Sequence, residues 1–250
     1  MTLDIWGECQ EQLATVTLTG GIIRVVESQE KVATNELVDT LEEQAVLEEM
    51  IEQTKPAILS SAQGFSYLLF TPFRYPPLKH GSRFGARFEP GLFYGSRTLT
   101  TALAETAFYR LHFWFDMSVP PPAGKIKTQH TALTVQIKTD KGLKLQTPPF
   151  SKFEMNLTDK TSYGVTQKLG ASMRENNIEA FETLSARDVA KDLNVGLFKP
   201  DVLCEKNPGS VMSLFCSTEE QGVEFMDEEG AVYHYWIDDF LDNGVFPRLT

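Results

Sequence analysis

Alternation of apolar and polar residues marks strands along much of the chain. Residues 13–24 alternate and are interrupted at Gly20 and Gly21, which predicts an early strand or hairpin whose second half covers 21–26. Short apolar runs predict further strands at 66–71, 92–94, 132–138, 143–146, 178–183 and 194–198, and a C-terminal hairpin joining 223–226 to 231–237. Strands are therefore expected throughout the sequence.

Apolar residues at helical spacing predict three helices. Thr40 and Glu43 form a capping box at the start of the first, which carries an apolar face around Val46 and ends near residue 53. The other two are expected from Thr98 to about 115 and over 162–176. Because strands and helices do not alternate as βαβ units, the pattern predicts an α+β fold.

Length, composition and charge narrow the class of protein. The chain has 250 residues, 42% of them hydrophobic, which is enough for one large domain or two small ones. Its formal net charge of −11, without a cluster of Lys and Arg, argues against direct nucleic-acid binding. Acidic residues concentrate in 36–52 and 219–242. Such segments are typical of a solvated surface, and a site for a basic protein partner is the alternative.

Cysteine and histidine positions indicate neither a disulfide framework nor a metal site. Cys9, Cys204 and Cys216 are odd in number and lack CxxC spacing, and the four histidines lack HxxxH or HxH spacing. The amino terminus shows no signal segment, and no apolar run is long enough to span a membrane. We therefore expect a soluble, cytoplasmic protein that needs no metal.

Glu105 is the strongest candidate for chemistry. It lies in the helix predicted after Thr98, on the side opposite Leu103 and Leu111, and apolar residues occupy much of that side too. A carboxylate on such a helix is costly unless it is paired. An ion pair with Arg110 or Arg83, or simple exposure, is the structural explanation. Stabilisation of an oxocarbenium ion at a ribose is the catalytic one.

An arginine-containing turn is the candidate phosphate site. Arg83 lies between Gly81 and Gly85, so the backbone can approach a ligand closely and the guanidinium can bind a diphosphate through paired hydrogen bonds. A solvated arginine is the simpler explanation. Arg74 and Arg87 are further candidates in the same stretch. The turn has neither Walker nor GxGxxG spacing.

Tyr94 and Ser185 each follow an apolar strand. A tyrosine at a strand end is most often a core residue, and the alternative is a ring stacked on nicotinamide or a hydroxyl directed at a ribose. A serine in a turn usually caps backbone groups. Since no GxSxG surrounds Ser185, a serine hydrolase is not predicted.

The order of these segments resembles the RES family, named for its Arg, Glu and Ser, whose members consume NAD and are mostly toxins of bacterial toxin–antitoxin pairs. The segments are Ile23-Arg24-Val25, Gly81-Ser82-Arg83-Phe84, Phe93-Tyr94, Ala102-Leu103-Ala104-Glu105 and Leu184-Ser185-Ala186-Arg187, followed by the strand 194–198. The similarity covers about residues 24–198. Segments 37–44 and 71–77 are similar to a longer subgroup with a helical insertion, here at about 36–56. Ser82 departs from the second glycine common in the family turn.

The resemblance implies a split, twisted mixed or antiparallel sheet with flanking helices, like that of ADP-ribosyltransferase toxins. A RES-like NAD-binding domain would cover 1–200, and 201–250 would be an extension packed on it. By the same resemblance, Glu105, Arg83 and Ser185 would be catalytic. The NAD-binding set would comprise Arg83, Tyr94 and Ser185 with Tyr75 and the family's first arginine, for which Arg24 and Arg74 both qualify.

The implied activity is cleavage of the nicotinamide–ribose bond of NAD, with phosphate (an NAD phosphorylase) or water (an NAD glycohydrolase) as acceptor and no metal. A mono-ADP-ribosyltransferase acting on a protein and a non-catalytic nucleotide- or protein-binding module are the alternatives. A toxin of this family would have a small Xre-type helix-turn-helix antitoxin as its partner. A free-standing enzyme and a homodimer are equally compatible with the sequence.

Overall fold

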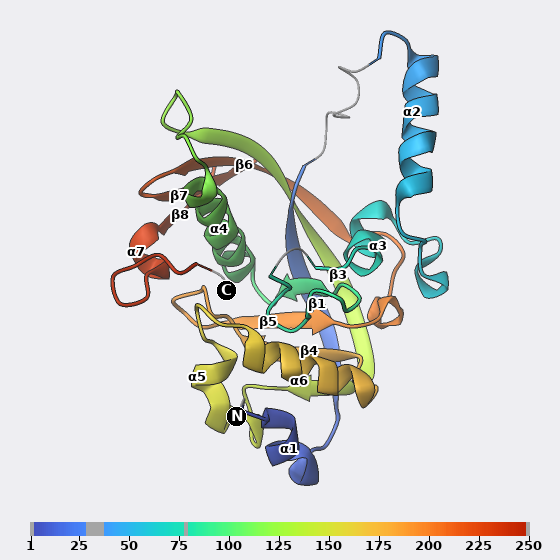
Figure 1. Cartoon of the computed structure of the whole chain (residues 1–250), viewed down its shortest axis with the longest axis vertical. Coiled ribbons are helices and arrows are strands. Elements are labelled where there is room, and N and C mark those ends of the chain that lie inside the picture. Colours follow the sequence, from blue (N-terminus) through green and yellow to red (C-terminus); the bar gives the residue numbers. More distant parts are fainter. Residues whose placement is uncertain (1–2, 29–37, 78–79, 249–250) are drawn as a thin grey trace.

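A computed structural model describes residues 3–28, 38–77 and 80–248 of the chain (Figure 1). It contains one mixed sheet of eight strands in the order β1-β2-β5-β4-β3-β6-β7-β8. The strands are β1 (Val16–Glu27), β2 (Phe93–Ser96), β3 (Ile126–Lys144), β4 (Ala180–Leu184), β5 (Leu193–Leu197), β6 (Ser210–Glu219), β7 (Gly222–Asp227) and β8 (Val232–Trp236). The predicted α+β class, with a mixed sheet and flanking helices, is confirmed.

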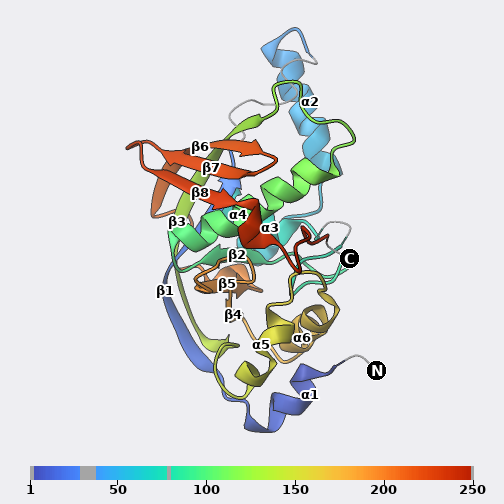
Figure 2. The ribbon, with the colours of Figure 1, turned by 90° about the vertical axis from the view of Figure 1, so that its left-hand side faces the viewer.

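The long strand β3 organises this sheet. Its residues 130–142 pair antiparallel with β1, its residues 126–134 pair antiparallel with β6, and its end pairs parallel with β4 at 142–144. Because β1 also pairs with β2 at Ile23↔Ser96, the strands β1, β2, β5, β4 and β3 form a closed circuit. The strands β6, β7 and β8 extend the sheet beyond it as an antiparallel meander (Figure 2).

Helices cover this sheet on several sides. They are α1 (Ile5–Cys9), α2 (Leu41–Thr54), α3 (Tyr67–Arg74), α4 (Leu99–Asp116), α5 (Glu154–Leu157), α6 (Gly164–Glu175) and α7 (Ile237–Phe240). In Figure 1, α4 lies on the concave side of the curved β3 and β6, whereas α1, α5 and α6 lie beyond β4. Within the described ranges, no helix combines the length and apolar content needed to cross a lipid bilayer.

Two hydrophobic cores hold α4 and α6 against the sheet. Leu103 and Phe108 of α4 are fully buried with Phe225 of β7. Met173 of α6 is buried with Phe181 of β4 in a separate cluster that also includes α1. Apolar burial of this kind is the main stabilising contribution to a domain of this size, and it anchors both helices beside the cavity described below.

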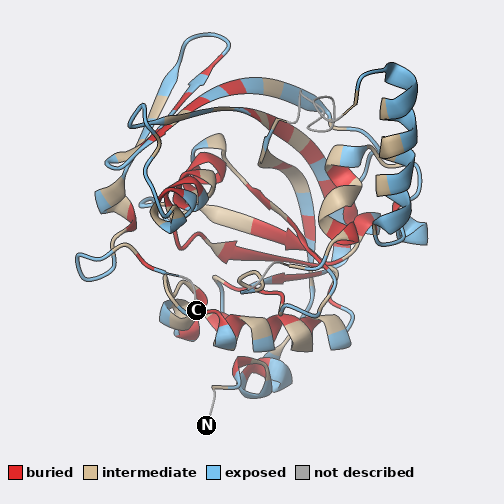
Figure 3. Ribbon diagram, turned by 45° about the horizontal axis from the view of Figure 1, so that its top comes forward, coloured by how far each residue is buried: buried red, intermediate tan, exposed pale blue. Residues whose placement is uncertain are grey.

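Helix α2 stands apart from the rest of the molecule (Figures 1 and 3). Its predicted start is confirmed, because the Thr40 hydroxyl accepts a hydrogen bond from the amide of Glu43 at 3.2 Å. The Glu43 carboxylate caps the amide of Asp39 instead of that of Thr40. None of its residues is buried, so the apolar face predicted around Val46, which is 58% exposed, packs into no core of the described chain.

Two strand predictions are wrong, and one alternative left open by the sequence is decided. Of the early strand or hairpin, the strand is confirmed as β1, because Gly20 takes a positive φ of 105° within the ladder and the chain continues without reversing. Residues 66–71 belong mostly to helix α3, in which Leu69 and Phe73, four positions apart, are both buried. The runs 132–138 and 143–146 lie largely in the one strand β3, and β6 was not predicted.

Candidate functional site

A cavity of about 340 Å³ opens between β1, β2, α4, the turn 82–84 and the start of α6, with β4 and β5 as its floor. Arg24, Arg83, Tyr94 and Glu105, four of the residues selected from the sequence, line it. Its volume falls within the range of about 300–1,000 Å³ that is typical of small-molecule sites. The structure thus brings together side chains from segments about 80 residues apart in the chain (Glu105 to Ser185).

Glu105 lines this cavity, and two neighbouring side chains hold one of its carboxylate oxygens. Its Oε1 accepts a hydrogen bond from the hydroxyl of Ser185 at 2.6 Å and another from the side-chain amide of Asn194 at 2.5 Å. Its Oε2 accepts no hydrogen bond from any residue that the structure describes. The ion pair considered from the sequence does not form, since Arg110 binds Glu27 at 3.1 Å. Among the described residues, this carboxylate therefore has neutral hydrogen-bond donors and no ion-pair partner.

Ser185 caps its turn, as considered from the sequence, and reaches the site through Glu105, although it is not among the residues that line the cavity. It lies in the turn after β4 and is 1% exposed. Its hydroxyl oxygen accepts hydrogen bonds from the amides of Arg187 and Asp188 at 3.1 and 3.0 Å, so it caps the turn. The same hydroxyl donates a hydrogen bond to the Glu105 carboxylate. A single rigid turn consequently fixes the direction of the Glu105 carboxylate.

Arg24 supplies the cavity with a cation that has no acidic partner among the described residues. It projects from β1, donates from Nη1 to the carbonyl of Tyr94 at 2.9 Å and lies 5.0 Å from the centre of the Phe93 ring. Its Nε is buried without a hydrogen-bond acceptor. Burial lowers the pKa of this guanidinium to about 10, so the cation is retained at neutral pH. A buried cation of this kind favours an anionic ligand.

Arg83 forms the opposite cationic wall. Its Nη1 donates to the carbonyls of Asp159 and Leu157 at 2.7 and 3.3 Å, and its guanidinium lies over the ring of Tyr163 at 4.8 Å. These contacts involve neutral acceptors and an aromatic face, so the charge of Arg83 is not cancelled by a direct ion pair with them. Two arginines and one carboxylate oxygen therefore surround the cavity.

Tyr94 holds the Arg83 turn in place. Its hydroxyl lies 3.1 Å from the hydroxyl of Ser82 and accepts a hydrogen bond from the amide of Phe84 at 3.1 Å. Burial raises the pKa of Tyr94 to about 12, while the hydrogen bonds to Ser82 and Phe84 oppose that rise. The ring lines the cavity, as a nicotinamide contact would require, but the hydroxyl is committed to the turn. Ser82, the departure from the family pattern, supplies one of these contacts.

Arg74, Tyr75 and Arg87 lie outside this cavity. Arg74 pairs with Glu52 of α2 at 2.7 Å and donates from Nε to the carbonyl of Pro56 at 2.6 Å, and its guanidinium lies 5.7 Å from the centre of the Tyr75 ring. Arg87 is exposed beside Phe88. Of the two candidates for the first family arginine, the structure brings only Arg24 to the cavity.

Asn194, Tyr109 and Tyr163 are among the cavity residues that were not selected from the sequence. Asn194 begins the family-like strand 194–198, and Tyr109 follows Glu105 by one helical turn, so position alone could have indicated both. Tyr163 lies at the start of α6 and gave no sequence signal. Its hydroxyl receives a hydrogen bond from Nη2 of Arg187 at 3.3 Å. Partial burial and the nearby Tyr163 and Glu105 raise the pKa of Tyr109, so its hydroxyl keeps its proton.

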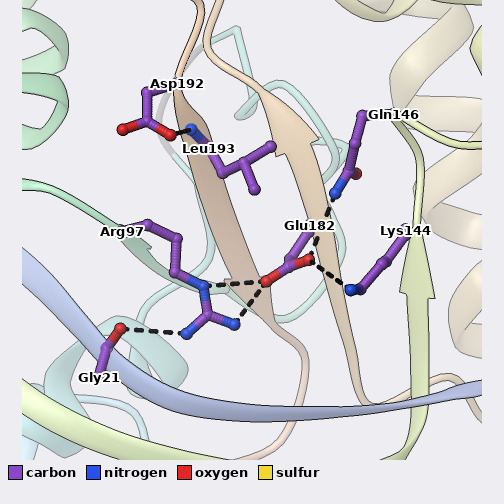
Figure 4. Close-up of polar contacts among 7 residues, drawn as sticks. All are labelled: Gly21, Arg97, Lys144, Gln146, Glu182, Asp192 and Leu193. Carbon is purple, nitrogen blue, oxygen red and sulfur yellow. Dashed lines mark hydrogen bonds and ion pairs between the residues drawn. The ribbon is translucent and has the colours of Figure 1, made fainter.

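A buried ion pair ties the elements around the cavity together (Figure 4). Arg97, between β2 and α4, donates to Glu182 of β4 from Nε at 2.9 Å and from Nη2 at 2.5 Å. Its Nη1 donates to the carbonyl of Gly21 in β1 at 3.0 Å. The second oxygen of Glu182 accepts from Gln146 at 3.3 Å. Since Ser96 and Thr183, the neighbours of this pair in sequence, line the cavity, the pair fixes its floor.

Gly170 lets α6 approach the Arg83 turn. A Cβ at this position would lie 2.0 Å from the carbonyl oxygen and 2.8 Å from the carbonyl carbon of Phe84, which are backbone atoms. We therefore expect Gly170→Ala to displace the turn, to cost at least about 1–3 kcal/mol of unfolding free energy and to weaken ligand binding. Urea denaturation and titration calorimetry with NAD measure the two effects.

Gly164→Ala in the same helix is the matched control, because nothing lies within 4 Å of a Cβ there. Removing a glycine from this helix is expected to leave stability unchanged or to raise it by about 0.4–1 kcal/mol. Equal stabilities of the two variants would show that the close approach of α6 to Phe84 does not constrain the turn.

Comparison with known proteins places this cavity in a family. The sequence matches the family model of the RES domain over residues 58–215, which is more than half of the chain. The match includes the Arg83 turn, Glu105, Ser185 and Asn194 and extends into β6, whereas Arg24 and α2 precede it. No curated protein matches the sequence. The family match is consistent with an NAD-related function of the toxin type.

Proposed function

Because the chain belongs to the RES domain family, we propose that it cleaves the bond between nicotinamide and ribose in NAD. The observation that carries this proposal is the presentation of Glu105. Ser185 and Asn194 hold its Oε1, and Glu105 lines a cavity that Arg24 and Arg83 also line. A dinucleotide has the complementary charges, a diphosphate for the arginines and a ribose that becomes cationic during cleavage.

The chemistry needs electrostatic stabilisation more than a nucleophile. The bond between C1′ of the ribose and the nicotinamide nitrogen breaks, and its electron pair leaves with nicotinamide, which departs as a neutral molecule. The ribose passes through an oxocarbenium-like state, which a fixed carboxylate oxygen stabilises. An acceptor oxygen then bonds to C1′ and loses its proton. Water as acceptor produces ADP-ribose, and phosphate produces a phosphorylated ADP-ribose.

Binding of the diphosphate is the task that the two arginines suit. Arg24 keeps its Nε free of protein acceptors, and Arg83 uses only Nη1 for its contacts with backbone carbonyls within the described chain. Guanidinium groups bind phosphate oxygens through charge-assisted hydrogen bonds. These local cations explain how an acidic chain, of net charge −11, binds an anionic substrate.

The identity of the molecule that accepts the ribose, water or phosphate, is a more specific part of the proposal. Arg187, a candidate cation for an acceptor phosphate, does not line the cavity; it donates from Nη2 to the carbonyl of Lys160 at 2.8 Å and lies 3.5 Å from the centre of the Phe108 ring. Phosphorolysis would therefore use Arg24 or Arg83 for the acceptor as well. In the cell, the proposed enzyme would act as a toxin that depletes NAD, and an Xre-type helix-turn-helix antitoxin would be its partner.

Turnover of NAD by the purified full chain tests the proposal. Nicotinamide release is followed by chromatography with and without inorganic phosphate, and the ribose product is identified by mass. We expect nicotinamide release in both conditions or in phosphate alone, and the product mass then identifies the acceptor. Labelled lysate proteins in the presence of labelled NAD would indicate a mono-ADP-ribosyltransferase instead. Intact NAD in every arm would overturn the proposal and favour a binding module.

A further inference from the structure

We propose that Asn194 is a positioning residue for Glu105 and that Ser96 sets the orientation of its amide. The inference rests on the proposed function, because it assigns Asn194 a part in the same reaction. Asn194 lines the cavity, and its side-chain amide donates a hydrogen bond to Glu105 at 2.5 Å. It would therefore act on the reaction through Glu105.

The register of two strands creates this arrangement. Ser96 at the end of β2 pairs directly with Asn194 near the start of β5. The Ser96 hydroxyl, which is 3% exposed, donates to Oδ1 of Asn194 at 2.6 Å. Because the Ser96 hydroxyl donates to the amide oxygen, the amide nitrogen points the other way, toward Oε1 of Glu105. A flipped amide would bring two oxygens together and lose the hydrogen bond to Glu105, while the Ser96 hydroxyl would then accept from the amide nitrogen.

The chemical nature of the donors matters as much as their position. Ser185 and Asn194 are both neutral, so they orient the Glu105 carboxylate without cancelling its charge. An arginine or lysine in either place would neutralise the group that faces a developing cation. With Oε1 held by one donor from the turn after β4 and one from β5, the carboxylate that lines the cavity cannot rotate freely. Orientation of this kind is realised before the substrate binds.

Kinetics of Asn194→Ala test the positioning. Loss of one hydrogen bond to a charged group is expected to lower kcat for nicotinamide release by about 10–100-fold while KM for NAD changes less than about threefold. Ser96→Ala is expected to have a smaller effect, and the double variant no more effect than Asn194→Ala alone, since Ser96 acts through Asn194. Exposed Asn207 provides the control variant Asn207→Ala. A rise in KM without a fall in kcat would overturn the proposal.

The pH profile separates positioning from a merely structural role. Asn194→Asp places a second carboxyl group against Glu105, and two adjacent carboxylates share a proton until the pH is high enough to ionise both. The acidic limb of the rate profile is therefore expected to move to higher pH by about one unit or more. An unchanged acidic limb would show that Asn194 does not contact Glu105 in the working enzyme.

A stability measurement tests the contact between Asn194 and Glu105 and does not require enzymatic activity. Like charges between Glu105 and the substituted side chain are expected to lower the melting temperature of Asn194→Asp increasingly as pH rises from mildly acidic to neutral. Glu105→Gln in the same chain removes one charge and is expected to restore most of the loss. If wild-type protein leaves NAD intact, the proposed function fails, and this rescue alone decides the positioning. If Glu105→Gln does not restore the melting temperature of Asn194→Asp, the positioning role of Asn194 is overturned.

Discussion

Glu105→Gln is expected to lower kcat for nicotinamide release by about 10²–10³-fold, because it removes the carboxylate that lines the cavity among the described residues. Glutamine has the same shape, and both neighbours of Oε1 are donors, so its carbonyl oxygen takes the Oε1 position. The amide nitrogen then occupies the place of Oε2 and presents a hydrogen-bond donor to a cationic ribose. The variant thus replaces attraction by repulsion with little change in volume.

The affinity for NAD is expected to change little in this variant, because the proposed diphosphate contacts of Arg24 and Arg83 are unaltered. Steady-state kinetics with titration calorimetry of NAD separate kcat from binding. Glu175→Gln, at the exposed end of α6, makes the same chemical change outside the cavity and should retain wild-type activity. Full activity of Glu105→Gln would exclude the assigned role of this carboxylate.

Glu182→Met is expected to have the largest effect on stability, about 3 kcal/mol of unfolding free energy. It leaves Arg97, whose side chain is 19% exposed, with a largely buried positive charge and only the carbonyl of Gly21 as an acceptor among the contacts shown in Figure 4. Both bonds from Arg97 to Glu182 are lost, and they link the start of α4 to β4. Urea denaturation measures the change.

The double variant Arg97→Met and Glu182→Met is the decisive comparison. Replacing both members of a buried pair by apolar side chains is often neutral, so the double variant should recover most of the stability that the single one loses. Glu154→Met breaks the exposed pair with Lys191, whose side chains are 43% and 58% exposed, and should cost no more than about 1 kcal/mol. If Glu182→Met were as stable as Glu154→Met, the ion pair between Arg97 and Glu182 would not contribute to the stability of the fold.

Local sequence patterns were sufficient for two helices beside the site and for a hairpin outside it. The helix predicted after Thr98 is α4, the helix predicted over 162–176 is α6, and the hairpin predicted at 223–226 and 231–237 is formed by β7 and β8. Each of these elements has an apolar periodicity that one face of the fold buries. The pattern at 13–26 left a strand and a hairpin open and the prediction at 66–71 failed, because glycine and aromatic residues permit either structure and long-range packing decides between them.

The sequence by itself determined the chemistry available to this protein: a carboxylate on an apolar helix, arginines near glycine turns, and a serine after a strand, in an order that resembles the RES family. Only the tertiary structure decided which of these side chains meet. It brought Arg24 to the cavity and paired Arg74 with Glu52, because β1 runs beside β2 while α3 faces α2. It also added Asn194, through a strand register set by hydrogen bonds between residues far apart in the chain. Such contacts depend on how elements pack, which no local pattern encodes.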